Sequence, residues 1–74
     1  MEDRAIVRAV AEATKRLSLS STEVAALAGV SVPTVTDLRL RGRVSRFERV
    51  RRGLVLFCQR AAVARSRSDL GLAP

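Results

Sequence analysis

The chain of 74 residues contains no histidine, no tryptophan and no tyrosine. Histidine is the usual general base and the commonest metal ligand, so its absence argues against an ordinary catalytic or metal site. Two phenylalanines are the only aromatic residues, and we expect both to be buried, which leaves no platform for stacking single-stranded bases. The sequence therefore favours a binding protein over an enzyme, and it predicts no cofactor and no metal.

Cysteine, proline and long apolar runs are also scarce. The single cysteine, Cys58, cannot form a disulfide within the chain and is expected to be a small core residue. There is no apolar run of 18 residues and no recognisable signal peptide, which predicts no membrane partner and a reducing, cytoplasmic setting. With four glycines, two prolines and 47% hydrophobic residues, the composition favours one compact helical domain.

Charge is the strongest compositional feature, with fourteen basic against seven acidic residues and a formal net charge of +7. Residues 1–38 carry four basic and five acidic side chains, whereas residues 39–67 carry ten arginines against the lone Glu48. A positive field concentrated in one half predicts that one part of the molecule faces a polyanion. Nucleic acid is the more common partner of this kind, and an anionic membrane the less common one.

Two helices are expected in the first 28 residues. Apolar residues recur at steps of three and four between Arg4 and Leu17, which is the spacing of one helix face. Ser20 and Glu23 then have the spacing of a capping box, in which each side chain bonds the backbone N–H of the other. A second, short helix is therefore predicted to start there and to end near Ala28.

The stretch AALAGVSVPTV, residues 25–35, predicts a sharp turn between two helices. Gly29 can adopt the left-handed conformation that ends a helix without steric penalty. Ser31 then offers an N-cap, and Pro33 lies in the first turn, where its missing N–H would have had no helical partner. A third helix is expected over residues 32–41, followed by a glycine that ends it.

A fourth helix is expected to begin at Ser45, which stands three residues before Glu48, and to run into the middle sixties. Gly53 weakens a helix by about 1 kcal/mol relative to alanine, so one helix or two shorter ones are both open. Residues 1–66 are expected to form the domain and residues 67–74, which lack periodicity, a flexible C-terminal tail. One apolar stripe of this helix is predicted to face the core: Phe47, Val50, Leu54, Phe57 and Ala61.

A helix, a glycine turn and a second helix at a steep angle form a helix-turn-helix, which presents its second helix to the DNA major groove. Ala25 is small where the helices cross, Gly29 makes the corner, and Val35 fills the angle between them. The stretch from Ser21 to Leu40 resembles the helix-turn-helix families of phage repressors and Cro proteins, and GVSVPTV is similar to the lac-repressor family. The resemblance implies an all-α, lambda-repressor-like domain of four to five helices, bacterial or phage-encoded, that represses transcription or regulates its own gene.

The next stretch, TVTDLRLRGRVSRF, is similar to the antitoxin branch of these proteins, whose members repress their own operons. This resemblance leaves open a second hypothesis, in which the chain chiefly binds a small protein partner and its DNA binding is secondary. The glycine-rich hairpin that winged helix-turn-helix proteins use as a wing is absent, which favours the repressor type.

The outward side of helix 32–41 supplies the predicted base contacts. Thr36 can donate, accept or pack its methyl group, and Asp37 can accept from cytosine N4. An ion pair between Asp37 and Arg41, four residues apart, is an equally weighted alternative for that carboxylate. Because this side has no Arg, Asn or Gln at its centre, we expect the DNA sequence to be recognised through apolar contacts and DNA shape. The candidates for base contact are Val32, Pro33, Thr36, Asp37 and Leu40.

The remaining candidates concern phosphate and a second subunit. Ser31 is expected to act first as a helix cap and second as a phosphate ligand. Leu56 and Val63 lie nearly opposite the core stripe, which predicts that they form a homodimer contact. An equally weighted alternative is that they are single apolar residues on the surface with no role, which are common. A dimer would read two half-sites about 34 Å apart. The candidates for phosphate contact are Ser31, Thr34, Arg41, Arg43, Arg46 and Arg49.

Overall fold

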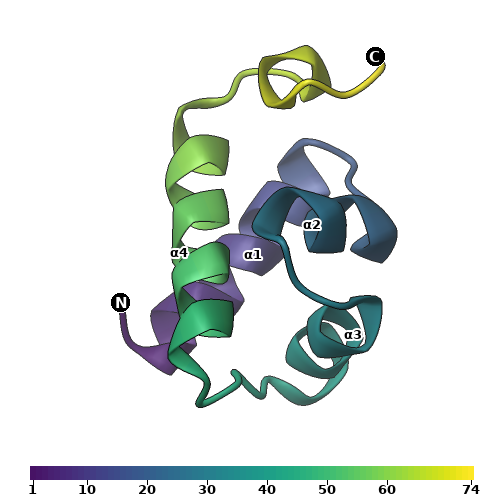
Figure 1. Ribbon diagram of the computed structural model, residues 1–74. Coiled ribbons are helices and arrows are strands. Elements are labelled where there is room, and N and C mark those ends of the chain that lie inside the picture. The colour runs from purple at the N-terminus through teal and green to yellow at the C-terminus, as the bar shows by residue number, and fades with distance from the viewer.

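The computed structural model describes all 74 residues and contains helices and no β-strand (Figure 1). In Figure 1, α4 runs along one side of the molecule, α2 and α3 lie across from it, and α1 passes behind them. The prediction of an all-α domain is confirmed. The elements are α1 (Asp3–Arg16), α2 (Ser21–Ala28), α3 (Val32–Arg41), α4 (Glu48–Val63) and a 3₁₀ helix, η1 (Arg67–Leu70).

The core is formed by one apolar side of each α-helix. Burial of each large side chain of this kind stabilises the folded state by about 1.5–3 kcal/mol, so these contacts are the main source of stability. Cys58 is also buried, as predicted. The largest fully buried side chains are Ile6 and Val10 of α1, Val24 of α2, Val35 and Leu38 of α3, and Leu54 and Phe57 of α4.

The local signals around α2 and α3 act as predicted. The N–H of Glu23 donates to Ser20 Oγ at 3.1 Å, and the N–H of Ser20 donates to Glu23 Oε1 at 3.0 Å, which completes the capping box. Gly29 ends α2 in the left-handed conformation, with φ 70° and ψ 34°. The Ser31 hydroxyl accepts a backbone N–H of α3 and caps it. Only residues 29–31 therefore separate the two helices, which we call the α2–α3 unit.

Gly53 allows α4 to pass close to α2. The sequence left open whether Gly53 divides this region into two shorter helices; α4 is one continuous helix through it. A Cβ atom at residue 53 would lie 2.2 Å from the carbonyl oxygen of Ala28, the last residue of α2. A backbone oxygen cannot rotate away as a flexible side chain does, so any larger residue would force the helices apart. The glycine that weakens α4 locally is thus required by its packing against α2.

The start of α4 differs from the prediction. Ser45 does not form a capping box with Glu48; its hydroxyl accepts the N–H of Phe47 at 3.1 Å, and the helix begins only at Glu48. Phe47, predicted to lie buried on the core stripe, is 76% exposed, so the expectation that no aromatic side chain is left for stacking on bases is wrong as well. These predictions are wrong for one reason: Phe47 precedes the first helical turn and has extended backbone angles, so its side chain does not follow the helical period.

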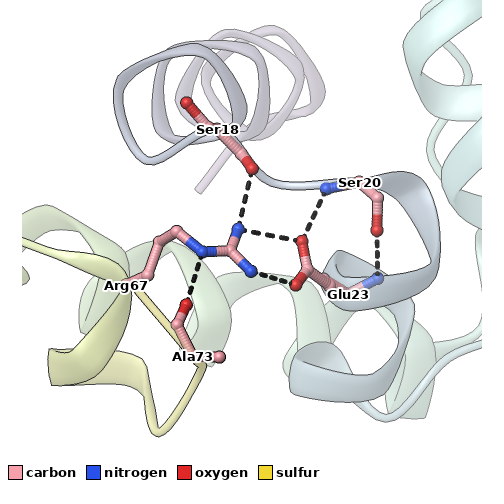
Figure 2. A network of polar contacts seen from close by, with 5 residues as sticks. All are labelled: Ser18, Ser20, Glu23, Arg67 and Ala73. Carbon is pink, nitrogen blue, oxygen red and sulfur yellow. Dashed lines mark hydrogen bonds and ion pairs between the residues drawn. The ribbon is translucent and has the colours of Figure 1, made fainter.

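Residues 67–74, expected to be a flexible tail, fold against α2. Leu70 of η1 is buried in the core. Arg67 forms a bidentate ion pair with Glu23, and its guanidinium also donates to the carbonyl oxygen of Ser18 at 2.8 Å (Figure 2). A single turn of 3₁₀ helix is too short to show an apolar period, so no pattern in the sequence marks this contact.

Glu23 therefore both caps α2 and binds the C-terminal segment, as Figure 2 shows. Hydrogen bonds from Arg67 and from the N–H of Ser20 lower the pKa of Glu23 from 4.5 to about 2. Between these two pH values the unfolded chain binds more protons than the folded one, so stability falls as the pH is lowered through this window. The contact is thus at full strength only above about pH 4.5.

We expect Gly53→Ala to lower the free energy of unfolding by roughly 1–3 kcal/mol through overpacking, although alanine favours an isolated helix by about 1 kcal/mol. Urea unfolding followed by circular dichroism measures the change. The control is Ala62→Gly, at an exposed position of the same helix, which should lower stability by about 1 kcal/mol. A Gly53→Ala protein that is as stable as the native chain would contradict the close packing of α4 against α2.

We expect the native chain to lose stability between about pH 4.5 and pH 2 more steeply than the Glu23→Gln variant, since glutamine cannot take up the proton. Thermal unfolding of both proteins at several pH values in this window measures the two slopes. Glu12→Gln is the control, because Glu12 forms an ion pair with Arg16 on the exposed surface of α1, and it should keep the native slope. Equal slopes for the native chain and Glu23→Gln would contradict the Arg67 contact.

Candidate nucleic-acid interface

The two sides of α3 differ in burial. Val35 and Leu38 are buried against the rest of the domain, as the sequence predicts. The opposite side is uncovered: Val32, Pro33 and Leu40 are exposed, while Thr36 and Asp37 are half-buried. All five predicted base-contact residues thus lie outside the core. An open hollow on this side is lined only by residues of α3, namely Val32, Pro33, Thr34, Thr36, Asp37 and Arg41.

Asp37 and Arg41 form the predicted ion pair along the last turn of α3. Arg41 Nη1 lies 2.9 Å from Asp37 Oδ1, and both side chains remain accessible to solvent. Exposed pairs at this spacing stabilise a helix by only about 0.3–0.5 kcal/mol, so separating the two groups costs little. The pair neutralises the one acidic side chain of α3 and leaves the second oxygen of Asp37 without a partner in the chain.

The N-terminal end of α3 carries two hydroxyl groups. Ser31 Oγ accepts the N–H of Thr34 at 3.2 Å, and the hydroxyls of the two residues lie 2.7 Å apart. Ser31 thus has its first predicted role, that of a helix cap. Positive helix-dipole charge and free N–H groups at such an end favour anions, so phosphate contact by Ser31 and Thr34 stays a prediction.

Free positive charge gathers just after α3. Arg43, Arg46 and Arg49 are exposed and take no part in the four ion pairs of the chain, and Arg52, which was not predicted, has the same properties. These residues lie on the segment 42–47 and the first turns of α4, which occupy the same end of the molecule as α3 (Figure 1). Unpaired guanidinium groups therefore lie on the segment that directly follows α3, at the same end of the molecule.

Two other arginines of the same run stabilise the fold instead. Arg39 donates to Ser21 Oγ at 2.7 Å and so joins α3 to α2. Arg51 forms an ion pair with Asp3 at 2.6 Å and donates to the carbonyl oxygen of Ser45 at 3.4 Å, which joins α4 to the N-terminus and to the preceding segment. The sequence does not distinguish these two residues from their free neighbours.

Arg4 and Arg8 of α1 are further basic residues that sequence reasoning missed. Both are exposed, and both line an open hollow that also includes Gly42, the residue that ends α3. The charge count placed them in the half of the chain with more acidic than basic groups. Their spacing of four puts them on one side of α1, but only the packing of α1 beside α3 brings them to this end.

The predicted dimer contact consists of two separated side chains on α4. Leu56 is 53% exposed and Val63 is 81% exposed, so both lie on the surface as expected. Leu56 shares an open hollow with Met1 and Val55, which adds apolar surface near it. Their exposure fits a contact with another protein, and the homodimer stays a prediction.

Three other features were considered: a reactive cysteine, a metal site and a membrane-spanning helix. Burial raises the pKa of the Cys58 thiol, which keeps it protonated and unreactive. No three side chains of the metal-ligating acidic, cysteine or histidine types lie together. None of the helices combines the length and the apolar character needed to cross a bilayer.

Comparisons of the chain with protein-family models, with curated proteins and with solved structures find no match.

Proposed function

We propose that this chain is a sequence-specific double-stranded DNA-binding transcriptional regulator, a repressor or autoregulator, that reads the major groove with α3. The uncovered outer side of α3, flanked by unpaired arginines at the same end of the molecule, is the observation that carries the proposal. In this proposal the α2–α3 unit is a helix-turn-helix of the lambda-repressor-like type, in keeping with the families that residues 21–40 resemble.

The dimensions and chemistry of α3 suit this role. Its ten residues make a rod about 15 Å long, and a helix of about 10–12 Å diameter fits the B-DNA major groove. Val32, Pro33 and Leu40 offer apolar surface to thymine methyl groups, and Thr36 offers a hydroxyl to base edges. The free oxygen of Asp37 can accept from cytosine N4 while Arg41 offsets its repulsion from phosphates.

The free arginines supply the affinity that does not depend on sequence. Arg43, Arg46 and Arg49 can each bind a phosphate oxygen through the planar guanidinium group, and Arg52, three residues after Arg49 on α4, is a candidate for a fourth contact. Contacts of this kind fix the position of the protein on the duplex and release condensed cations. Binding is therefore expected to weaken steeply with salt.

A second candidate function is that of a protein-interaction module with secondary DNA binding, in the manner of antitoxins. The exposure of Leu56 and Val63 favours it, because these two apolar side chains belong to α4 and not to α3. The same surface suits a homodimer, in which two copies would read half-sites about 34 Å apart. A second copy would bring the basic groups Arg52 and Arg60 of both chains close together, so such a dimer should be stronger at higher salt.

Selection of bound duplexes from a random pool tests the proposal. We expect the native chain to select a defined sequence and Thr36→Ala to lose the preference at one position, with a change of about 1–3 kcal/mol for a specific base contact. Arg65→Ala, at an exposed position beyond the far end of α4, is the control and should select the native sequence. A palindromic product supports the dimer, whereas a native chain that selects no sequence refutes base readout by α3.

Salt titration separates phosphate contact from base contact. We expect Arg46→Ala to bind all duplexes more weakly and to reduce the slope of log K against log salt by about 0.9, the value for one lost phosphate contact. Arg65→Ala is the matched control, because Arg65 is an exposed arginine beyond the far end of α4, and its slope should equal that of the native chain. Identical slopes for all three proteins would contradict phosphate binding by the segment after α3.

A further inference from the structure

Phe47 is the most unusual exposed side chain of the domain. It is 76% exposed, whereas the other aromatic residue, Phe57, is 1% exposed. Scattered apolar residues are normal on a protein surface, and exposure alone assigns no role to Phe47. Its role is indicated by two further observations, the fixed backbone on both sides of it and the charges around it.

The backbone around Phe47 is held in place. Its N–H donates to Ser45 Oγ at 3.1 Å, and its carbonyl oxygen accepts the N–H of Arg51 at 3.0 Å. Arg51 also donates to the carbonyl oxygen of Ser45 and is itself anchored by Asp3. Val44 packs partly buried against the core. An exposed aromatic side chain on a fixed backbone loses little freedom when it binds, which favours a contact surface.

The charges around Phe47 select the kind of partner. Arg46 and Arg49 stand on either side of it in sequence, both exposed and outside the ion pairs, and the adjacent Glu48 is the only acidic side chain between residues 39 and 67. The net charge of this segment is therefore strongly positive, which repels a second copy of the same segment and attracts a polyanion. An aromatic ring between arginines suits a duplex, whose charged backbones border an apolar base stack.

The location of Phe47 relates it to α3. The segment 42–47 leaves the C-terminal end of α3 and leads into α4 at the same end of the molecule (Figure 1). In the proposed complex, with α3 in a major groove, this segment would meet the strand that borders the groove, with the neighbouring minor groove beyond that strand. Arg43, Arg46 and Arg49 are candidates for binding the phosphates of this strand, and the exposed Phe47 lies among them in the sequence.

We propose that Phe47 is a wedge that enters the minor groove beside the site of α3, partly unstacks one base step and bends the duplex. The inference rests on the proposed function and adds to it a second, indirect source of specificity. Apolar side chains that kink DNA in this way favour flexible pyrimidine–purine steps such as TA and CA. Sequence preference at such a step would complement α3, whose outer side has no Arg, Asn or Gln at its centre for bidentate contact with purines.

Fluorescence of 2-aminopurine placed at the step next to the site of α3 tests the wedge, because this base becomes brighter when it is unstacked. With the native chain and its selected duplex, the fluorescence is expected to rise at least twofold and energy transfer between end-labelled dyes to report a bend. Phe47→Ala should abolish both signals and weaken binding roughly tenfold, the size of one lost stacking contact. Phe47→Leu, which keeps an apolar wedge, should retain part of both signals.

The controls separate failure of the wedge from failure of the function. Arg65→Ala, at an exposed position beyond the far end of α4, should leave both signals unchanged. Native binding without a fluorescence rise, or Phe47→Ala with native signals, overturns the wedge and leaves DNA binding intact. Loss of a dimer in sedimentation of Phe47→Ala, with unchanged fluorescence, makes the side chain a protein contact and also overturns it. A native chain that binds no duplex overturns both proposals.

Discussion

The close approach of α4 to the last residue of α2 decides where α3 points. Because residue 53 has no side chain, the carbonyl oxygen of Ala28 lies directly against α4, and the end of α2 is held at a fixed position. Gly29 then turns the chain in the left-handed conformation, and α3 starts within three residues. The direction of α3 follows from these two glycines together. Burial of Val35 and Leu38 keeps its inner side on the core and its outer side free.

Arginine has two separate tasks in this domain. One group stabilises the fold. Arg16 donates to the carbonyl oxygens of Ala61 and Ala64 at the end of α4, and Arg67 binds Glu23 and so holds the C-terminal segment in place. Carbonyl groups at a helix end need such donors, since no helical N–H reaches them. The other group has no partner in the chain and gathers beside α3. The net charge of +7 therefore does not by itself say where the unpaired positive charge lies; that depends on which arginines stabilise the fold.

Much of the fold could be predicted because its signals are local. The apolar period of α1, the Ser20 capping box and the turn at Gly29 each act within a few residues, and each is present in the structure. The features that were not predicted depend on contacts between segments that are distant in the sequence. Residue 53 must be glycine because α2 packs against it. Residues 67–74 are held in place by a single helical turn that buries one leucine, Leu70. The candidate site divides in the same way: the outward side of α3 follows from its period, whereas the exposure of Phe47 and the placement of the α1 arginines do not.

The proposed division of work assigns base edges to α3, phosphates to the free arginines and groove shape to the segment between α3 and α4. All three depend on α3 meeting the duplex with its outer side. Amide chemical-shift mapping of the isotope-labelled chain, titrated with a duplex that it selects, tests this claim most directly. The account predicts that the largest shifts fall on residues 31–49, with those beyond residue 56 nearly unchanged. Shifts concentrated on α4 around Leu56 and Val63, with the amides of α3 unmoved, would contradict it.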